Sequence, residues 1–134
     1  MKELTLARAH ASIGAARYAV AITSRHHTMQ ADESPLLGGQ DTGPAPYDLL
    51  LASLGACTSI TLKMYAERKQ WDLQSLRVDL SYSRDGDKAR IDRALTIEGS
   101  LDDAQRARLA DVAERTPVTL TLKSGVEILT ELRS

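Results

Sequence analysis

Residues 32–58 read DESPLLGGQDTGPAPYDLLLASLGACT, a glycine- and proline-rich loop that runs directly into an apolar segment. We expect that segment to begin a helix over Tyr47–Lys69, because Pro46 suits a first helical turn and Asp48 favours the positive end of the helix dipole. Between Asp48 and Lys63 the predicted helix is apolar nearly all round, so it should be buried and central. The rest of the chain is then expected to pack around this helix.

Alternating apolar and polar residues predict strands on both sides of the central helix. Arg84–Asp87 has the composition of a hairpin turn between two of them. A second helix is expected to begin near Asp102, with Gln105 as its capping-box partner, and to stop before Pro117. The predicted strands are Leu4–His10, Tyr18–Thr23, a short piece around His27 and Met29, Leu76–Tyr82, Ala89–Ile97, Val118–Leu122 and Val126–Leu132.

This order of strands, helix, hairpin, helix and strands predicts an α+β fold with a largely antiparallel sheet. The chain has 134 residues and carries no repeat or linker, so we expect a single domain over residues 1–134. Hydrophobic residues make up 43% and charged residues 26%, which is typical of a globular protein. The sequence therefore predicts one domain with its own core.

The formal net charge is −1 and aromatic residues make up 4%, so neither a basic field nor stacking platforms would attract nucleic acid. The charge-free apolar stretch Leu49–Leu62 is shorter than the ~20 residues of a membrane span, and the N-terminus lacks the apolar region of a secretory signal. Cys57 is the single cysteine, which suits a reducing compartment. We therefore expect a cytoplasmic protein without a membrane or nucleic-acid partner.

Two further patterns could suggest a ligand. Residues 38–43, GGQDTG, precede a helix, but they lack the Lys-Ser/Thr ending of a P-loop, and Pro44 removes a donor that an anion would need. His26 and His27 are adjacent, so on a strand they would point to opposite faces. We therefore expect a tight structural loop, no metal and no cofactor.

Cys57 has two possible roles on its helix. A lone cysteine in an apolar run is usually a small buried hydrophobe. A reactive cysteine requires its thiolate form, and no residue near Cys57 in the sequence would stabilise that form. A catalytic Cys57 would therefore need a base or cation brought to it by tertiary or quaternary contact.

Residues 32–58, together with Met64–Lys69 and Trp71, resemble the osmotically induced protein C / organic hydroperoxide resistance (OsmC/Ohr) family. The similarity is greatest to the branch with the motif GGxDxGPxPYELLLAALGACT. This resemblance implies an OsmC-like α+β fold whose sheet wraps two helices, in an intertwined homodimer with two active sites at the subunit interface. In active members the helix cysteine attacks the peroxide O–O bond and becomes a sulfenic acid. A second cysteine then resolves it as a disulfide, and an external dithiol reduces that disulfide.

Carried over residue by residue, the resemblance places Cys57 in the peroxide-attacking position. Thr116 stands where the family has its second cysteine, so no disulfide can form within the chain. The resemblance thus implies a one-cysteine cycle in which an external thiol reduces the oxidised Cys57.

The family also places an arginine and a carboxylate beside the reactive cysteine. The family's catalytic glutamate falls on Tyr47, and the nearest carboxylate is that of Asp48. Arg17 is preferred to Arg25 as the arginine that stabilises the thiolate. The expected site is therefore Cys57, Arg17 and either Asp48 or Tyr47.

The leading expectation is a thiol-dependent hydroperoxide-reducing enzyme of the oxidative stress response. Its partners would be a second copy of the chain, a small hydroperoxide and an external thiol reductant. One alternative is a non-catalytic OsmC-like dimer that binds a small apolar ligand lined by Cys57. The other is a redox sensor in which oxidation of Cys57 is the signal.

Overall fold

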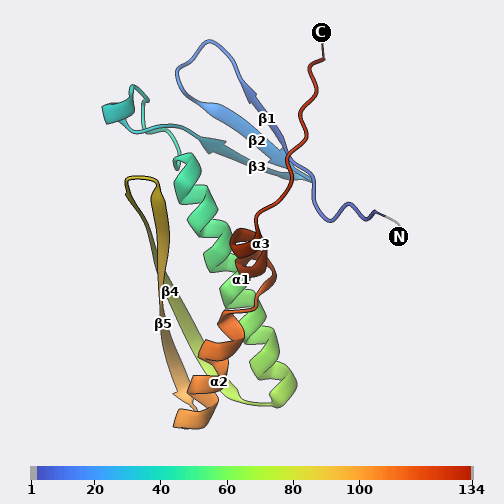
Figure 1. Cartoon of the computed structure of the whole chain (residues 1–134), viewed down its shortest axis with the longest axis vertical. Coiled ribbons are helices and arrows are strands. Elements are labelled where there is room, and N and C mark those ends of the chain that lie inside the picture. Colours follow the sequence, from blue (N-terminus) through green and yellow to red (C-terminus); the bar gives the residue numbers. More distant parts are fainter. Residues whose placement is uncertain (1–2, 134) are drawn as a thin grey trace. The chain divides into compact units, whose positions relative to one another are not determined.

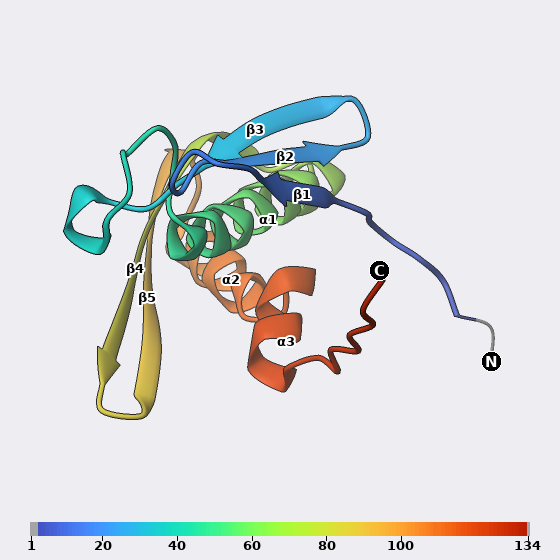
Figure 2. The same cartoon turned by 90° about the horizontal axis from the view of Figure 1, so that it is seen from above.

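The computed structural model describes residues 3–133, which divide into two compact units on either side of Leu50 and Leu51. The first unit contains a three-stranded antiparallel sheet in the order β1-β2-β3, with its strands side by side in Figure 2. The strands are β1 (His10–Ile13), β2 (Val20–Ser24) and β3 (His27–Ala31). The strands predicted around Tyr18–Thr23 and His27 are therefore confirmed to within two residues.

The strand predicted from the alternation over Leu4–His10, in a run that Gly14 ends, is confirmed only in its last part, where β1 ends at Ile13. Only His10 belongs to β1, and residues 3–9 are neither strand nor helix. Leu4 and Leu6 are 77% and 91% exposed. A strand is stabilised by pairing with a neighbour, and this alternating segment has no neighbouring strand within the described chain.

The segment after β3 is a tight loop, as expected. It contains one short 3-10 turn, η1 (Pro35–Leu37), and leads into α1 (Pro46–Lys69). In α1 the carboxylate of Asp48 accepts a hydrogen bond from the Ala45 amide at 2.9 Å. The helix thus begins within one residue of the predicted start and ends at the predicted residue.

The prediction that α1 is buried nearly all round is wrong for the single chain. Its buried residues lie one turn apart along a single stripe, while Ile60 and Met64 are 57% and 52% exposed. α1 is also the one described helix that is long and apolar enough to cross a membrane by length and composition. One stripe of the helix is nevertheless buried and packs in the core of the second unit. That stripe consists of Leu54, Thr58, Leu62 and Ala66.

The second unit is built on a long antiparallel ribbon of β4 (Asp72–Asp85) and β5 (Lys88–Ser100). In Figure 1 the ribbon is the long hairpin whose turn carries Gly86 in the left-handed region, with φ of 65°. Leu76 pairs with Ile97, and Leu80 pairs with Arg93. The hairpin predicted from Arg84–Asp87 is confirmed, although both strands are longer than the sequence pattern predicted.

Helices α1 and α2 (Asp103–Ala113) pack against the ribbon and enclose the core of the second unit. Leu62 from α1 and Leu109 from α2 are fully buried, and Leu76 and Leu95 of the ribbon pack against them. The capping box of α2 is present as predicted, since the side chains of Asp102 and Gln105 each bond the other's backbone amide.

The C-terminal strands predicted over Val118–Leu122 and Val126–Leu132 are both wrong. The first segment lies in a third helix, α3 (Pro117–Ser124), because Pro117 occupies the first helical turn, where its missing N–H costs nothing. Residues 125–133 form no helix or strand in the described chain. The fold of residues 3–133 is α+β with antiparallel sheets, and these residues form three α-helices where the sequence predicted two.

Candidate functional site

Cys57 lies in the middle of α1, between Ala56 and the buried Thr58. It is a free cysteine of intermediate burial, and its Sγ lies 3.9 Å from Thr61 Oγ1, one turn further along the helix. A hydroxyl at that distance is a weak partner, so the thiol remains available for chemistry. Partial exposure is typical of reactive cysteines, whereas inert structural cysteines are fully buried.

The other predicted site residues lie in the first unit. Arg17 lies 5.7 Å from the centre of the Tyr18 ring, and Tyr47 is about half exposed at the start of α1. Asp48 and Cys57 are nine residues apart on one unbroken helix, which separates them by about 13 Å along the axis and places them on opposite faces. Within one chain, therefore, Asp48 and Cys57 cannot face the same small substrate.

Asp32, which follows directly after β3, is a buried carboxylate that the sequence analysis did not single out. It is 2% exposed. Its Oδ1 accepts from the amides of Tyr18 and Glu33 at 3.1 and 2.7 Å, and its Oδ2 accepts from the amide and the hydroxyl of Thr42. The Thr42 hydroxyl, followed by the backbone amides, holds the pKa of Asp32 far below its usual range.

Asp32 also explains why residues 38–43 form no phosphate cradle. The Gln40 amide points at Asp32 Oδ1 at 3.4 Å, so the chain's own carboxylate occupies the space that an anion would need. A Cβ on Gly39 would lie 2.0 Å from Glu33 O, and one on Gly43 would lie 2.1 Å from Gln30 O. The prediction of a tight structural loop is confirmed, because backbone passes directly against both glycines.

Arg93 is a second buried polar centre, on the inward face of β5. Its side chain is 12% exposed. Its Nη1 donates to Thr58 Oγ1 on α1 at 3.0 Å and to Thr119 Oγ1 on α3 at 2.9 Å. Its Nη2 donates to Ala113 O at the end of α2 at 3.0 Å and lies 3.4 Å from Glu114 Oε2. One guanidinium thus connects β5 to all three helices.

A signal for Arg93 exists in the sequence. Ile91, Leu95 and Ile97 share its face of the alternating strand, so a charged residue interrupts an otherwise apolar row. A buried charge requires hydrogen-bonding partners. Those partners lie 20–35 residues away in the sequence, and no short-range pattern identifies them.

Thr116, which the resemblance predicts to replace the family's second cysteine, is fully buried at the N-terminus of α3. Its Oγ1 lies 2.6 Å from Thr119 Oγ1, and the Thr119 hydroxyl also reaches Ala113 O at 3.3 Å. Thr116 therefore belongs to the same hydrogen-bonded network as Arg93.

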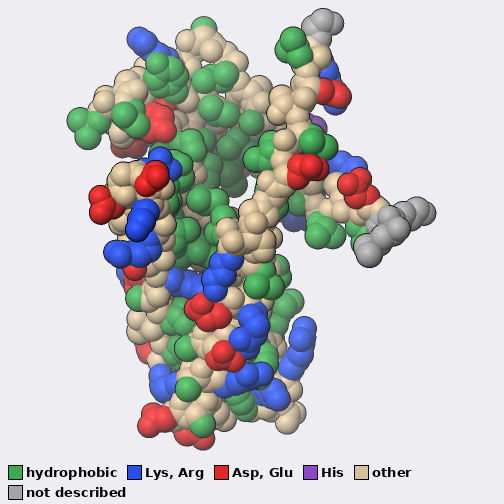
Figure 3. Space-filling view, viewed as in Figure 1, with side chains coloured by type: hydrophobic (Ala, Val, Ile, Leu, Met, Phe, Trp, Pro, Cys, Tyr) green, Lys and Arg blue, Asp and Glu red, His purple; other side chains and the backbone are tan. Residues whose placement is uncertain are grey.

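At the surface of the second unit, Glu114 extends this network into solvent. Lys123 bonds it at 3.0 Å, and the ammonium of Lys123, followed by the guanidinium of Arg93, lowers the pKa of the Glu114 carboxyl. Charged side chains gather over α2 and its C-terminal end, as the blue and red atoms in Figure 3 show. Because these pairs are exposed, each contributes little to stability.

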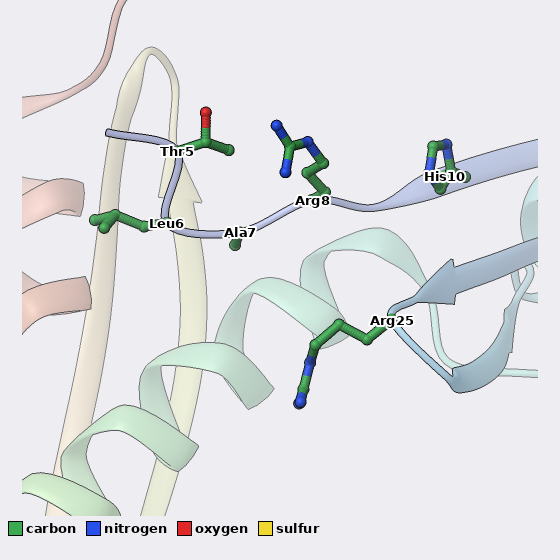
Figure 4. A pocket seen from close by; sticks show the side chains of 6 residues that line it. All are labelled: Thr5, Leu6, Ala7, Arg8, His10 and Arg25. Carbon is green, nitrogen blue, oxygen red and sulfur yellow. The ribbon is translucent and has the colours of Figure 1, made fainter. Parts of the chain in front are cut away.

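The first unit carries a shallow pocket of about 370 Å³ beside the N-terminal segment. Its polar side chains are those of Thr5, Arg8, His10 and Arg25. Figure 4 shows the side chains of Arg8 and Arg25 pointing in different directions, so they do not converge on one ligand. Arg25, the alternative to Arg17 in the predicted site, thus lines this pocket.

No group of three or more metal-ligating side chains gathers anywhere in residues 3–133. His26 and His27 lie against each other, with ring centroids 4.1 Å apart. Neither histidine is accompanied by the further ligands that a metal site requires.

Comparison with known proteins identifies the family. The OsmC-like protein family matches residues 39–131, a span that includes Gly39, Gly43, Cys57, Arg93 and Thr116. The match covers more than half of the chain, so this protein belongs to the OsmC-like family. No curated protein matches the sequence.

Solved structures of similar proteins have the same fold. An OsmC-like protein from Mycoplasma pneumoniae aligns with a TM-score of 0.75 at 19% identity, over 89% of this chain and 88% of its own. The organic hydroperoxide resistance protein OsmC of Legionella pneumophila gives 0.65 at 19% identity, over 91% and 92%. The organic hydroperoxide resistance protein OhrB of Bacillus subtilis gives 0.63 at 22% identity, over 93% and 96%. At these identities the likeness shows the α+β fold.

Proposed function

We propose that this protein is a homodimeric, cytoplasmic hydroperoxide reductase of the oxidative stress response that uses Cys57 and an external thiol. We also propose that it belongs to the branch defined by the motif GGxDxGPxPYELLLAALGACT. The observation that carries the proposal is Cys57 itself. It lies within the family match on an unbroken helix and is free, incompletely buried and without a strong hydrogen-bond partner for its sulfur. Two structural relatives are named organic hydroperoxide resistance proteins.

The proposed reaction has two stages. The Cys57 thiolate attacks the distal oxygen of an alkyl hydroperoxide, so that an S–O bond forms, the O–O bond breaks and the alkoxide leaves as the alcohol after taking a proton. The sulfenic acid then reacts with an external thiol, releases water and forms a mixed disulfide. A second thiol releases Cys57 by thiol–disulfide exchange, and the reductant leaves as its own disulfide.

Arg17 is assigned the role of stabilising the thiolate, and Asp48 or Tyr47 that of orienting Arg17. If Asp48 assists Cys57, it does so from the partner subunit, because the two residues lie on opposite faces of one helix. Mixed dimers of Asp48→Asn and Cys57→Ser chains test this arrangement, since one site of each mixed dimer then keeps both groups. Substantial activity supports assistance from the partner, and near-zero activity contradicts it.

A homodimer is supported by the apolar segments that the single chain leaves exposed. Four side chains after α3 are 64–98% exposed, and the N-terminal Leu4 and Leu6 are similarly exposed. Both segments have sequences typical of strands, and pairing with a second copy would give them neighbours. We expect an interface above ~2,000 Å², the range of obligate dimers. The four C-terminal side chains are Val126, Ile128, Leu129 and Leu132.

The decisive experiment measures consumption of an alkyl hydroperoxide by the purified protein with excess dithiol, beside Cys57→Ser. We expect turnover in the natural chain and none above background in the variant. Whole-protein mass spectrometry after a peroxide pulse should show one added oxygen on Cys57, and a mixed disulfide when a small thiol is included. Equal rates in the two proteins would refute the enzyme.

A non-catalytic dimer that binds a small apolar ligand is the second candidate. It is favoured by Thr116, whose hydroxyl is fully committed to a network that includes no second sulfur. In this case Cys57 lines the ligand site and resists peroxide until the protein is unfolded. A redox sensor would differ from both, because Cys57 would oxidise once without sustained turnover.

A further inference from the structure

We propose that Arg93 is a positioning residue for Cys57: it fixes the rotation of α1 about its own axis, and thereby the direction in which the sulfur points, by holding the neighbouring Thr58. The inference rests on the proposed function for its peroxide measurement, while a second measurement is independent of that function. Arg93 acts on the sulfur indirectly, through its hydrogen bond to Thr58.

α1 packs tightly against the ribbon at Gly55. A Cβ on Gly55 would lie 3.0 Å from Leu80 Cδ1, so the helix lies close to β4 at that point. Leu80 pairs with Arg93 across the ribbon. The contact at Gly55 and the hydrogen bond at Thr58 are therefore made by facing residues of the two strands, and Cys57 lies between them on α1.

Two hydrogen bonds restrict the rotation of α1 against the ribbon. Lys63 Nζ donates to Leu73 O at 2.7 Å nearly two turns beyond Cys57, and Thr58 makes the bond next to Cys57. The buried stripe of α1 is otherwise apolar, and apolar contacts have no preferred direction. A hydrogen bond depends steeply on distance and angle, so the bond from Arg93 Nη1 to Thr58 Oγ1 restricts rotation. The Thr58 hydroxyl donates in turn to Leu54 O at 2.7 Å, which fixes the side chain of Thr58 to its own helix.

Arg93 is itself held in place by residues of α2 and α3. Its guanidinium is anchored from the opposite side by Thr119 Oγ1 and Ala113 O, so it is not free to follow a rotating helix. The same hydroxyl of Thr119 contacts that of Thr116. Burying a guanidinium is costly, and an aliphatic side chain would fill this apolar row of β5 at lower cost. The hydrogen bonds therefore point to a positional role beyond packing.

The test compares four variants of the full chain, each first shown to be folded by circular dichroism and thermal melting. Arg93→Met keeps the length and removes the donors, and Arg93→Lys keeps a charged donor. Thr58→Val removes the hydroxyl that accepts from Arg93 and donates to Leu54 O. Arg106→Met is the matched control, since Arg106 also reaches inward to three carbonyls, at Ile97, Gly99 and Leu101. Those carbonyls belong to the C-terminal end of β5 and to Leu101, which lies between β5 and α2.

Two rates are measured for each protein: formation of the Cys57 sulfenic acid with tert-butyl hydroperoxide, and alkylation of Cys57 by iodoacetamide. A reacting atom displaced by ~1 Å can lose about 100-fold in rate, so we expect Arg93→Met to slow the peroxide step about tenfold and Thr58→Val about threefold. Arg93→Lys should recover part of the loss. Arg106→Met should remain within about twofold of the natural chain, whatever its melting temperature.

Natural rates in both Arg93→Met and Thr58→Val would overturn the proposal, and so would an equal loss in Arg106→Met, which would indicate general loosening. If Arg93→Met does not fold, the two rates of Thr58→Val are compared with those of Arg106→Met. A loss in Thr58→Val alone supports the proposal, and equal rates contradict it. If the natural chain does not react with peroxide, the proposed function fails. The alkylation rates then decide alone: a change of at least about threefold in Thr58→Val but not in Arg106→Met supports positioning, and equal rates refute it.

Discussion

The two buried polar centres of this protein are built in opposite ways. Asp32 is an anion surrounded by donors, and every partner of its carboxylate lies within 14 residues in the sequence. Arg93 is a cation surrounded by acceptors, and its partners lie 20–35 residues away. The first centre shapes one loop, whereas the second holds together elements distant in the chain. Sequence reasoning predicts the loop and misses the network, because only the loop is built from local interactions.

The largest effect is expected from Gly39→Ala, which breaks the loop around Asp32. The added Cβ would lie 2.0 Å from Glu33 O, and backbone cannot yield as a flexible side chain can. We expect the free energy of unfolding to fall by about 3 kcal/mol, as for severe overpacking. Urea unfolding measures the change. Gly14→Ala is the control, because nothing lies within 4 Å of its Cβ.

Arg93→Met breaks the second centre and should have the next largest effect on stability. It removes the donors to Thr58, Thr119 and Ala113, and these buried acceptors then lose their charged partner. We expect a loss of about 2 kcal/mol in the free energy of unfolding, measured in the same urea experiment. If the variant is as stable as the natural chain, the network restricts the rotation of α1 without contributing to the free energy of unfolding.

Acid should separate the two centres. Asp32 has a folded pKa far below that of an unfolded aspartate, so its contribution to stability is complete above about pH 4 and falls as the pH drops towards the folded pKa. Urea unfolding at decreasing pH gives the free energy of unfolding, which should fall in the natural chain below about pH 4. Asp32→Asn should remove part of this fall, whereas Arg93→Met should keep most of it, because Lys123 is the main cause of the lowered Glu114 pKa. An equal fall in Asp32→Asn and the natural chain would contradict the assignment.

The smallest effects are expected from removing a single hydroxyl in each centre. Thr116 is fully buried and Thr42 is exposed, although both hydroxyls make short hydrogen bonds. We expect Thr42→Val to cost about 1.5 kcal/mol and Thr116→Val about 1 kcal/mol, because the Thr42 hydroxyl donates to an ionised, buried carboxylate and the Thr116 hydroxyl contacts a neutral hydroxyl. Thermal melting of the two variants gives the comparison, and a reversed order would contradict it.

The sequence predicts elements that carry their own local signals. The capping box at Asp102 and the turn at Gly86 are of this kind, and both were placed correctly. The segment after Pro117 was misassigned because its alternating Val, Thr and Leu residues have high strand propensity, while a proline in the first helical turn favours a helix. Leu4–His10 and Val126–Leu132 were misassigned because a strand depends on a neighbour that the sequence pattern cannot supply.

The candidate site was predictable to a similar extent. Cys57 follows from the motif and the helix that carries it. Arg93 does not, because a single charged residue in an apolar row indicates burial but not its partners. Tyr47, Asp48 and Arg17 stay predictions, since their role depends on how chains assemble.

The long β4–β5 ribbon has a consequence for the order of folding. Its strands are joined by a turn of only two residues, Gly86 and Asp87. Pairing therefore begins with little loss of chain entropy and extends from the turn towards the other end of the ribbon. Hairpins form in about 1–10 μs, whereas contacts distant in sequence wait for loops to close. We expect the ribbon to form early and the hydrogen bonds from Arg93 to the three helices to form late. Substitutions in the Arg93 network should then accelerate unfolding more than they slow folding.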